Sequence, residues 1–281
     1  MKWTRGHSSG ALEDRRGGGG GRAAGIGGLG VVGTVVVLVI GHFTGLDVSG
    51  LLGGGDGGGG EPIPADQDAD RELVEFVSFV LDDAQGNWAA QLPRETGTPY
   101  REAKLVLFRE GVQTGCGSAD SGVGPFYCPA DERVYIDLSF YRLLDSKFGA
   151  PGDFAQAYVL AHEIGHHVQH ITGMFEKGRD RERRGEDANA VSVRQELQAD
   201  CYAGIWAHAT RNKQLLEAGD IEEGLAAAAA VGDDTLQKRS RGGVQPETWT
   251  HGSAAQRQKW FRKGLDGGKV SDCDTFAVES P

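Results

Sequence analysis

Two histidines four residues apart constrain this chain more than any other feature of its sequence. On a helix, His162 and His166 project from the same face, so both imidazole rings can point at a single metal ion. Glu163 lies about a quarter turn away, where its carboxylate can take a proton from a metal-bound water. The His-Glu-x-x-His pattern therefore predicts a helix that carries two ligands and the general base of a zinc hydrolase.

The residues around the motif favour this helix, which we predict from Asp153 to His170. Pro151-Gly152 interrupts the preceding chain, Asp153 is a capping residue, and Gly173 ends the helix. The alternative is a solvated helix that contains the motif by chance. The apolar residues that lead into the motif argue against it, because they place the histidines on a buried face, where an imidazole needs a partner.

A catalytic zinc ion takes three protein ligands and keeps one position open, so a third ligand is needed. A metzincin would supply histidine at position 172 after glycine at position 169, but this chain has Thr172 and Gln169 there. His170 lies about 12 Å along the helix axis from His162, too far to share the ion. We therefore predict structural roles for His170 and for its neighbour His167.

A better third ligand is Glu196, in a second predicted helix over residues 194–209. Glu196 and Asp200 are four residues apart and face the same way. Glu196 would complete a His/His/Glu zinc site, and Asp200 would accept the remaining ring N–H of a liganding histidine. The alternative is that both are solvated charges. Their apolar neighbours argue against it, because carboxylates in so apolar a helix need a cation.

Longer motifs resemble known peptidases. His162-Glu163-x-x-His166 followed by Glu196-Leu-x-Ala-Asp200 resembles the gluzincin arrangement, including the membrane-associated HtpX and CAAX-prenyl-protease types. A closer resemblance, to the bacterial putative neutral zinc metallopeptidase family, covers nearly the whole chain. Its motifs are Asp14-Arg15-Arg16 with the glycines that follow, Cys116-Gly-Ser-Ala, Gly124-Pro-Phe-Tyr-Cys128-Pro, Asp153-Phe-Ala-Gln-Ala-Tyr158, Gln198-Ala-Asp-Cys201-Tyr-Ala-Gly, Thr250-His251-Gly-Ser and Cys273-Asp-Thr-Phe276. The resemblance implies a zinc peptidase but no particular substrate.

His251 is a further candidate catalytic residue. Thr250-His251 with the downstream Arg257 resembles an element of HtpX-like peptidases, and Ser253 with Gln256 is typical of a capping box that opens the last helix. A histidine there would stabilise the tetrahedral intermediate or transiently occupy the open coordination position. The alternative is a structural histidine in a turn.

An apolar stretch at residues 26–46 lies between glycine-rich segments and is long enough to predict a single transmembrane helix. By the positive-inside rule, residues 1–25 are a disordered basic cytoplasmic tail. Residues 47–65 are a glycine-rich linker, and residues 66–281 are an extracytoplasmic zinc metallopeptidase domain anchored to the bacterial cytoplasmic membrane. A core helix and a cleaved signal peptide are the alternatives. The flanking linkers disfavour the first, and the lack of an Ala-x-Ala site disfavours the second.

The four cysteines allow three pairings if the domain faces an oxidising compartment. The simplest pairing joins Cys116 to Cys128 across a short loop and Cys201 to Cys273. Thiolate zinc ligation is the alternative, but the chain contains no Cys-x-x-Cys motif.

The expected fold class is α+β: a mostly helical, zincin-like domain with a small β-sheet. We predict strands at 104–108 and 133–138, of which 134–138 would be an edge strand able to bind an extended peptide. Tyr127 and Tyr202 would be oxyanion donors or packed aromatics. Further helices are predicted at residues 70–91, 221–239 and 254–265, and a solvated connector is predicted at residues 178–189.

The predicted function is hydrolysis of peptide bonds in a protein or peptide by one Zn²⁺ ion. The alternative is a catalytically inactive, membrane-tethered zinc-binding or scaffold protein. Nucleic acid is not an expected partner, because the net charge of −11 repels phosphate.

Overall fold

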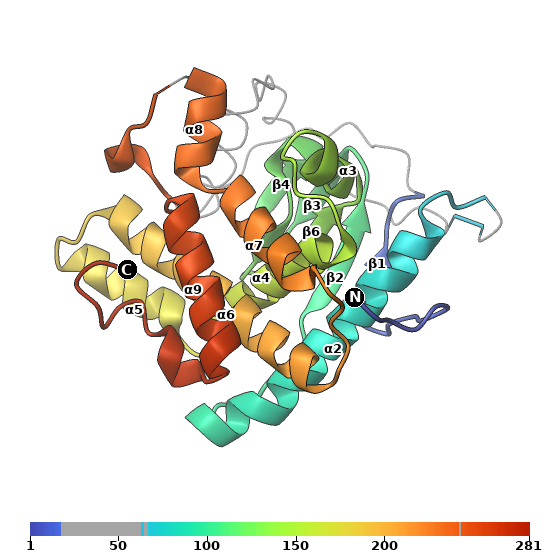
Figure 1. Cartoon of the computed structure of the whole chain (residues 1–281), viewed down its shortest axis with the longest axis horizontal. Helices are drawn as coiled ribbons and strands as arrows, with labels where there is room; N and C mark the ends of the chain where they lie inside the picture. The colour runs from blue at the N-terminus through green and yellow to red at the C-terminus, as the bar shows by residue number, and fades with distance from the viewer. Residues whose placement is uncertain (18–62, 65–66, 242) are drawn as a thin grey trace.

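A computed structural model describes residues 1–17, 63–64, 67–241 and 243–281 (Figure 1). Helices dominate it and pack beside a small sheet, so the predicted α+β class, mostly helical, is confirmed. The helices are α2 (Arg71–Thr96), α3 (Ser139–Ser146), α4 (Asp153–Ile171), α5 (Met174–Arg183), α6 (Ala188–Asn212), α7 (Asp220–Ala230), α8 (Asp233–Arg241) and α9 (Ala254–Gly267), with short 3-10 turns at Ser121–Val123 (η2), Pro246–Thr248 (η3) and Val270–Cys273 (η4).

The main sheet has four strands in the order β1-β2-β6-β5. Its strands are β1 (Leu12–Asp14), β2 (Lys104–Phe108), β6 (Arg133–Asp137) and β5 (Phe126–Cys128). Pairing is parallel from β1 to β2 and from β2 to β6, and antiparallel from β6 to β5. A separate hairpin joins β3 (Gly111–Thr114) to β4 (Gly117–Asp120).

The predicted edge strand at 134–138 is wrong. That segment is β6, which pairs with β2 on one side and with β5 on the other. Residues 133–135 are paired on both sides, so this part of the strand has no free edge to which an extended peptide could add. An alternating pattern does not reveal how many neighbours a strand has, because the pattern reports burial of side chains and not pairing of the backbone.

Two other predicted segments, one helix and one connector, also differ from the structure. The helix predicted over 221–239 is divided into α7 and α8 at Gly232, where a Cβ would lie only 2.4 Å from Ala254 N. Most of the predicted solvated connector at 178–189 is helical, because α5 ends at Arg183 and α6 begins at Ala188. Ion pairs spaced by one turn on α5, such as Arg183 with Asp180, are compatible with a helix as well as with a solvated loop.

The predicted location in the bacterial cytoplasmic membrane is contradicted. Within the described residues, no helix is both long and apolar enough to cross a membrane, and the span predicted at 26–46 lies outside them. Residues 1–17, predicted to belong to a disordered cytoplasmic tail, are packed on the domain, where β1 pairs in register with β2. A single crossing would put β1 and β2 on opposite sides of the membrane, so their pairing excludes the predicted topology.

Arg16 fixes the end of this N-terminal segment. Its side chain is 1% exposed, and Nη2 lies 2.7 Å from Asp68 Oδ2 and 2.6 Å from Asp14 Oδ2. A buried guanidinium of this kind needs carboxylate partners, which here come from both sides of the undescribed residues 18–62. The Asp14-Arg15-Arg16 motif is therefore a structural element of the domain.

Helices α6 and α9 approach each other through glycine. A Cβ on Gly264 would lie 2.0 Å from Cys201 O, and one on Gly204 would lie 2.1 Å from Phe261 O. Only glycine allows two helix backbones to come so close. This contact sets the position of α9 against the helix that carries Glu196.

Gly264→Ala is therefore expected to lower the free energy of unfolding by about 3 kcal/mol, because neither backbone can yield to the added methyl group. Gly86→Ala is the matched control, since Gly86 is an exposed position in α2 with no atom within 4 Å of the added Cβ. It should raise stability by about 0.5 to 1 kcal/mol. Urea unfolding of both variants measures the difference, and equal effects would show that the α6–α9 contact is not as close as described.

Candidate metal centre

Helices α4 and α6 bring the three predicted ligands together. One potential ligand atom from each of His162, His166 and Glu196 lies within 4.8 Å of the others. His162 Nε2 is 3.2 Å from Glu196 Oε2, and His166 Nε2 is 3.5 Å from Glu196 Oε1. Each imidazole therefore faces a different oxygen of one carboxylate. The helices come this close partly because Gly165 on α4 meets Ala199 on α6, where an added Cβ would lie 3.0 Å from the carbonyl oxygen.

This donor set fits zinc. Two imidazole nitrogens and one carboxylate oxygen are ordinary zinc ligands, and three protein ligands leave a fourth position for water or substrate. His162 and Glu196 are buried, whereas His166 is partly exposed, so the centre lies at the edge of the core. The buried Glu196 carboxylate faces two imidazole rings, and a buried carboxylate needs a cation as its partner.

Asp200 positions His162, as the sequence predicts. It is fully buried, and its Oδ1 accepts a 2.8 Å hydrogen bond from His162 Nδ1. The same carboxylate accepts from the hydroxyl of Tyr158 and, in a bidentate pair, from Arg257 Nε and Nη2, both at 2.8 Å. Because Nδ1 of His162 is used as a donor, Nε2 is the nitrogen left for a metal ion.

The charges of this network shift the pKa values of both partners. Burial raises the pKa of Asp200, but the Arg257 charge and the interaction with His162 overcome it and bring the pKa to about 2. Burial lowers the pKa of His162, but the charge of Asp200 and the hydrogen bonds to Asp200 and Glu196 raise it to about 9. The metal-free centre therefore binds a proton on His162, and zinc must displace it. Zinc affinity should fall as the pH is lowered.

Glu163 lies on α4 beside both histidines and is buried. Burial raises the pKa of its carboxyl group, and the neighbouring His166 and His162 oppose this shift. A carboxylate whose pKa is raised towards neutrality is a better proton acceptor than a solvated one, as a general base requires.

The loop that carries His251 lies against α6, near Glu196. Gly252 packs beside Val193 and Leu197 of that helix, and an added Cβ there would lie 3.3 Å from both side chains. Burial lowers the pKa of His251, but the charge of Glu196 and the interaction with Asp233 raise it. The structure thus places the loop that carries His251 beside the helix that carries Glu196.

Asp233, which the sequence analysis missed, holds this loop. Its Oδ2 accepts hydrogen bonds from the backbone N–H groups of Thr250, His251 and Gly252 at 2.8, 2.7 and 3.0 Å. Its Oδ1 lies 3.2 Å from His251 Nδ1, which leaves Nε2 of that histidine free. No local sequence pattern marks Asp233, because its partners lie 17 to 19 residues farther along the chain.

The remaining predicted aromatic and histidine positions lie in structural contacts. Tyr127 donates to His167 Nδ1 at 3.0 Å, and His167 Nε2 is 2.6 Å from the carbonyl oxygen of Arg101. Tyr202 packs edge-on against Trp88 at 5.3 Å between ring centroids. For both tyrosines the structure favours the packed alternative over an oxyanion donor. His170 Nε2 lies 3.5 Å from a carboxylate oxygen of Glu132, away from the three ligands.

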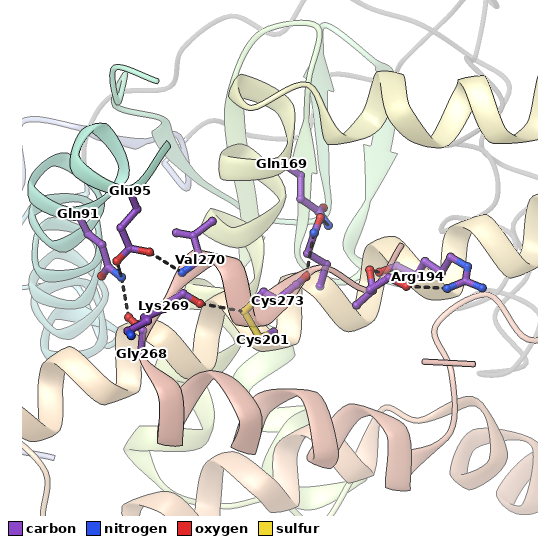
Figure 2. Close-up of a disulfide and its surroundings, with 11 residues drawn as sticks. Gln91, Glu95, Gln169, Arg194, Cys201, Gly268, Lys269, Val270 and Cys273 are labelled. Carbon is purple, nitrogen blue, oxygen red and sulfur yellow. Dashed lines mark hydrogen bonds between the residues drawn. A yellow bond between two sulfur atoms is a disulfide. The ribbon is translucent and has the colours of Figure 1, made fainter. Parts of the chain in front are cut away.

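Both predicted disulfides are present. Cys116 is bonded to Cys128, and Cys201 is bonded to Cys273. Since this accounts for all four cysteines of the sequence, no thiolate is available as a zinc ligand. The second disulfide is next to Asp200 in sequence and joins α6 to the C-terminal segment (Figure 2).

A second group of carboxylates, Asp153, Asp220 and Glu223, also lies within 4.8 Å. Its members already have partners. The Met1 ammonium group donates to Asp153 at 2.6 Å and to Asp220 at 3.3 Å, and Glu223 accepts from Phe154 N at 3.1 Å. This cluster therefore holds the N-terminal segment against α4 and α7.

Comparison with known proteins identifies relatives along almost the entire sequence. A family model described as "Putative neutral zinc metallopeptidase" matches residues 1–276. The "Uncharacterized protein YpfJ" of Escherichia coli (strain K12) is 43% identical over 291 residues, which cover 98% of this chain and 99% of that protein. The "Uncharacterized protein Rv2575" of Mycobacterium tuberculosis (strain H37Rv) is 43% identical over 222 residues, which cover 75% of this chain and 73% of that protein. No solved structure gives a significant match.

Proposed function

This chain belongs to the family described as "Putative neutral zinc metallopeptidase", and from that premise we propose that it hydrolyses peptide bonds in proteins or peptides at a single zinc ion. The observation that carries the proposal is the convergence of His162, His166 and Glu196 from two helices, with their ligand atoms within 4.8 Å. Glu163 lies beside them on α4. These are the parts that metal-assisted hydrolysis requires.

In this proposal His162, His166 and Glu196 hold the ion. When bound, zinc lowers the pKa of a coordinated water and polarises the scissile carbonyl group. Glu163 accepts the proton of the attacking water and later delivers it to the leaving amine. Asp200 keeps Nδ1 of His162 protonated, so that Nε2 faces the ion.

His251 is proposed to stabilise the oxyanion that forms at the carbonyl oxygen. The charge of Glu196 and the interaction with Asp233 raise its pKa, which favours the imidazolium form, and Nδ1 faces Asp233, which leaves Nε2 to donate. A preorganised donor of this kind acts mainly on the transition state.

His251→Ala is therefore expected to lower kcat/KM by about 10² to 10³-fold without reducing zinc content. Peptide-cleavage kinetics and elemental analysis of the same preparation measure the two quantities. The conservative His251→Gln variant, which keeps one N–H donor, should recover part of the loss. Loss of zinc together with activity would instead place His251 among the groups that hold the ion.

The proposed function is tested with the purified full chain. Removal of metal with a chelator should abolish cleavage of casein or of a peptide library, and one equivalent of Zn²⁺ should restore it. His162→Ala should lose both zinc and activity, because two protein ligands bind the ion weakly. Zinc binding at one equivalent without cleavage of any substrate would support the inactive zinc-binding or scaffold protein instead, and no zinc binding would refute both.

A further inference from the structure

Buried hydrogen bonds connect the Cys201–Cys273 disulfide to His166. The carbonyl oxygen of Cys273 accepts from Gln198 Nε2 at 2.9 Å, and Gln198 Oε1 accepts from Gln169 Nε2 at 3.1 Å. Gln169 Oε1 then lies 2.8 Å from His166 Nδ1. Gln169 and Gln198 are 0% and 2% exposed, so water does not compete for these bonds. Figure 2 shows Gln169 directed towards the segment that contains Cys273.

We call this chain of hydrogen bonds, from Cys273 through Gln198 and Gln169 to His166, the relay. Two backbone carbonyl groups fix which atom donates and which accepts at each step. A carbonyl oxygen can only accept, so the group of Gln198 that faces Cys273 O must be its NH₂, and its Oε1 must face Gln169. Gln195 O likewise accepts from Gln169 Nε2 at 2.6 Å. Both N–H donors of Gln169 are therefore in use, and Oε1 is the only atom that it can offer to His166.

The relay determines which nitrogen of His166 carries the proton. Because Gln169 Oε1 can only accept, His166 Nδ1 must donate. Nε2 then has a free lone pair and lies 3.5 Å from Glu196 Oε1. Asp200 makes the same selection for His162, so the two histidines are oriented by different partners.

The C-terminal segment supports the relay from a distance. The disulfide bonds it covalently to α6 across a sequence separation of 72 residues. Beside it, buried Arg194 donates from Nη1 to Thr275 O at 2.6 Å, and Thr275 Oγ1 donates to Arg194 O at 2.7 Å (Figure 2). These contacts hold the segment that contains the carbonyl group of Cys273 beside α6.

We propose that Gln169 is a positioning residue for the metal centre, and that the disulfide-bonded segment Cys273–Thr275 keeps it in place through Gln198. The proposal rests on the function proposed above, in that His166 is taken to be a ligand. Its consequence is that the Cys201–Cys273 disulfide supports metal affinity as well as stability.

The first test measures zinc affinity by competition with a chromogenic chelator. Gln169→Leu removes the acceptor and is expected to raise the Kd for Zn²⁺ about 10 to 100-fold. Gln198→Met breaks the relay one step farther away and should have a smaller effect in the same direction. Circular dichroism of the metal-free proteins identifies any variant that does not fold. If Gln169→Leu does not fold, the Kd of Gln198→Met tests the proposal in its place. An unchanged Kd in a folded Gln169→Leu protein overturns the proposal while leaving the proposed function intact.

The two disulfides provide a matched pair of variants that tests whether the Cys201–Cys273 bond supports zinc affinity. The double variant Cys201→Ala with Cys273→Ala should raise the Kd for Zn²⁺, whereas Cys116→Ala with Cys128→Ala should not, because the latter bond lies between β5 and the β3–β4 hairpin turn. Equal effects would show that the support is general stability and would overturn this part of the proposal.

A third readout does not involve zinc. Two-bond ¹H–¹⁵N correlation spectra of the metal-free full chain report the tautomer of His166. The wild type is expected to carry the proton on Nδ1, and Gln169→Leu is expected to lose this preference. If the protein bound no zinc, the proposed function would fail, but the tautomer of His166 would still test the relay. A wild-type protein with the His166 proton on Nε2 would overturn the proposal that Gln169 positions His166.

Discussion

Glu163→Gln is expected to lower kcat/KM for peptide hydrolysis by about 10³-fold while zinc content stays at the wild-type value. The amide has the size of the carboxylate but cannot accept the proton of the attacking water. Zinc is retained because Glu163 is not one of the three side chains whose ligand atoms converge. Cleavage kinetics and elemental analysis of one preparation measure both quantities.

The free energy of unfolding of Glu163→Gln shows whether a loss of activity comes from the chemistry or from the fold. Burial raises the pKa of Glu163, which means that its charged form is costly in the fold. The neutral glutamine should therefore leave the free energy of unfolding unchanged or slightly increased. If Glu163→Gln cleaves peptides as well as the wild type does, the general base is another residue. If it loses zinc, Glu163 contributes to holding the ion.

Arg257→Met is expected to lower the free energy of unfolding by about 3 to 5 kcal/mol, because it removes the guanidinium that pairs in bidentate fashion with the buried Asp200 carboxylate. Arg257 is 3% exposed, and it also donates to Tyr158 OH at 3.3 Å. Zinc affinity should fall as well, since Asp200 would no longer be held towards His162. Urea unfolding and chelator competition measure the two effects.

Arg183→Met is the matched control, because Arg183 pairs with Asp180 and Glu176 on the exposed surface of α5. It should change the free energy of unfolding far less than Arg257→Met does, because water screens an exposed ion pair. An equally small effect of Arg257→Met would show that the buried pair contributes no more than a surface pair.

The pH dependence gives a further check on Arg257→Met. In the wild type the pKa of Asp200 is lowered from its ordinary value of 3.8 to about 2, so its contribution to stability is complete above pH 3.8 and is lost as the pH falls through about 2. In the variant, Asp200 can take up a proton at a higher pH and become neutral. The stability difference between the two proteins should therefore narrow below about pH 4. A constant difference would mean that Asp200 is not the group affected.

The sequence predicted the centre better than it predicted the topology. The helix of the His-Glu-x-x-His motif and both disulfide pairs agree with the structure, and Glu196 lies where a third ligand is needed. The roles of these side chains in binding zinc and in catalysis stay predictions. The membrane location was wrong because hydropathy and charge report composition, whereas β1 pairs with β2 through backbone groups that leave no composition signal.

The sequence by itself determined the features that depend on neighbours along the chain. Residues four positions apart on a helix share a face, so the spacing of His162 with His166 and of Glu196 with Asp200 was sufficient to group them. Only the tertiary structure decided what orients these groups. Arg257, Asp233 and the carbonyl group of Cys273 act across 57, 18 and 75 residues of sequence separation. A buried polar group takes whichever partner the packed fold brings to it, and no local spacing specifies that partner.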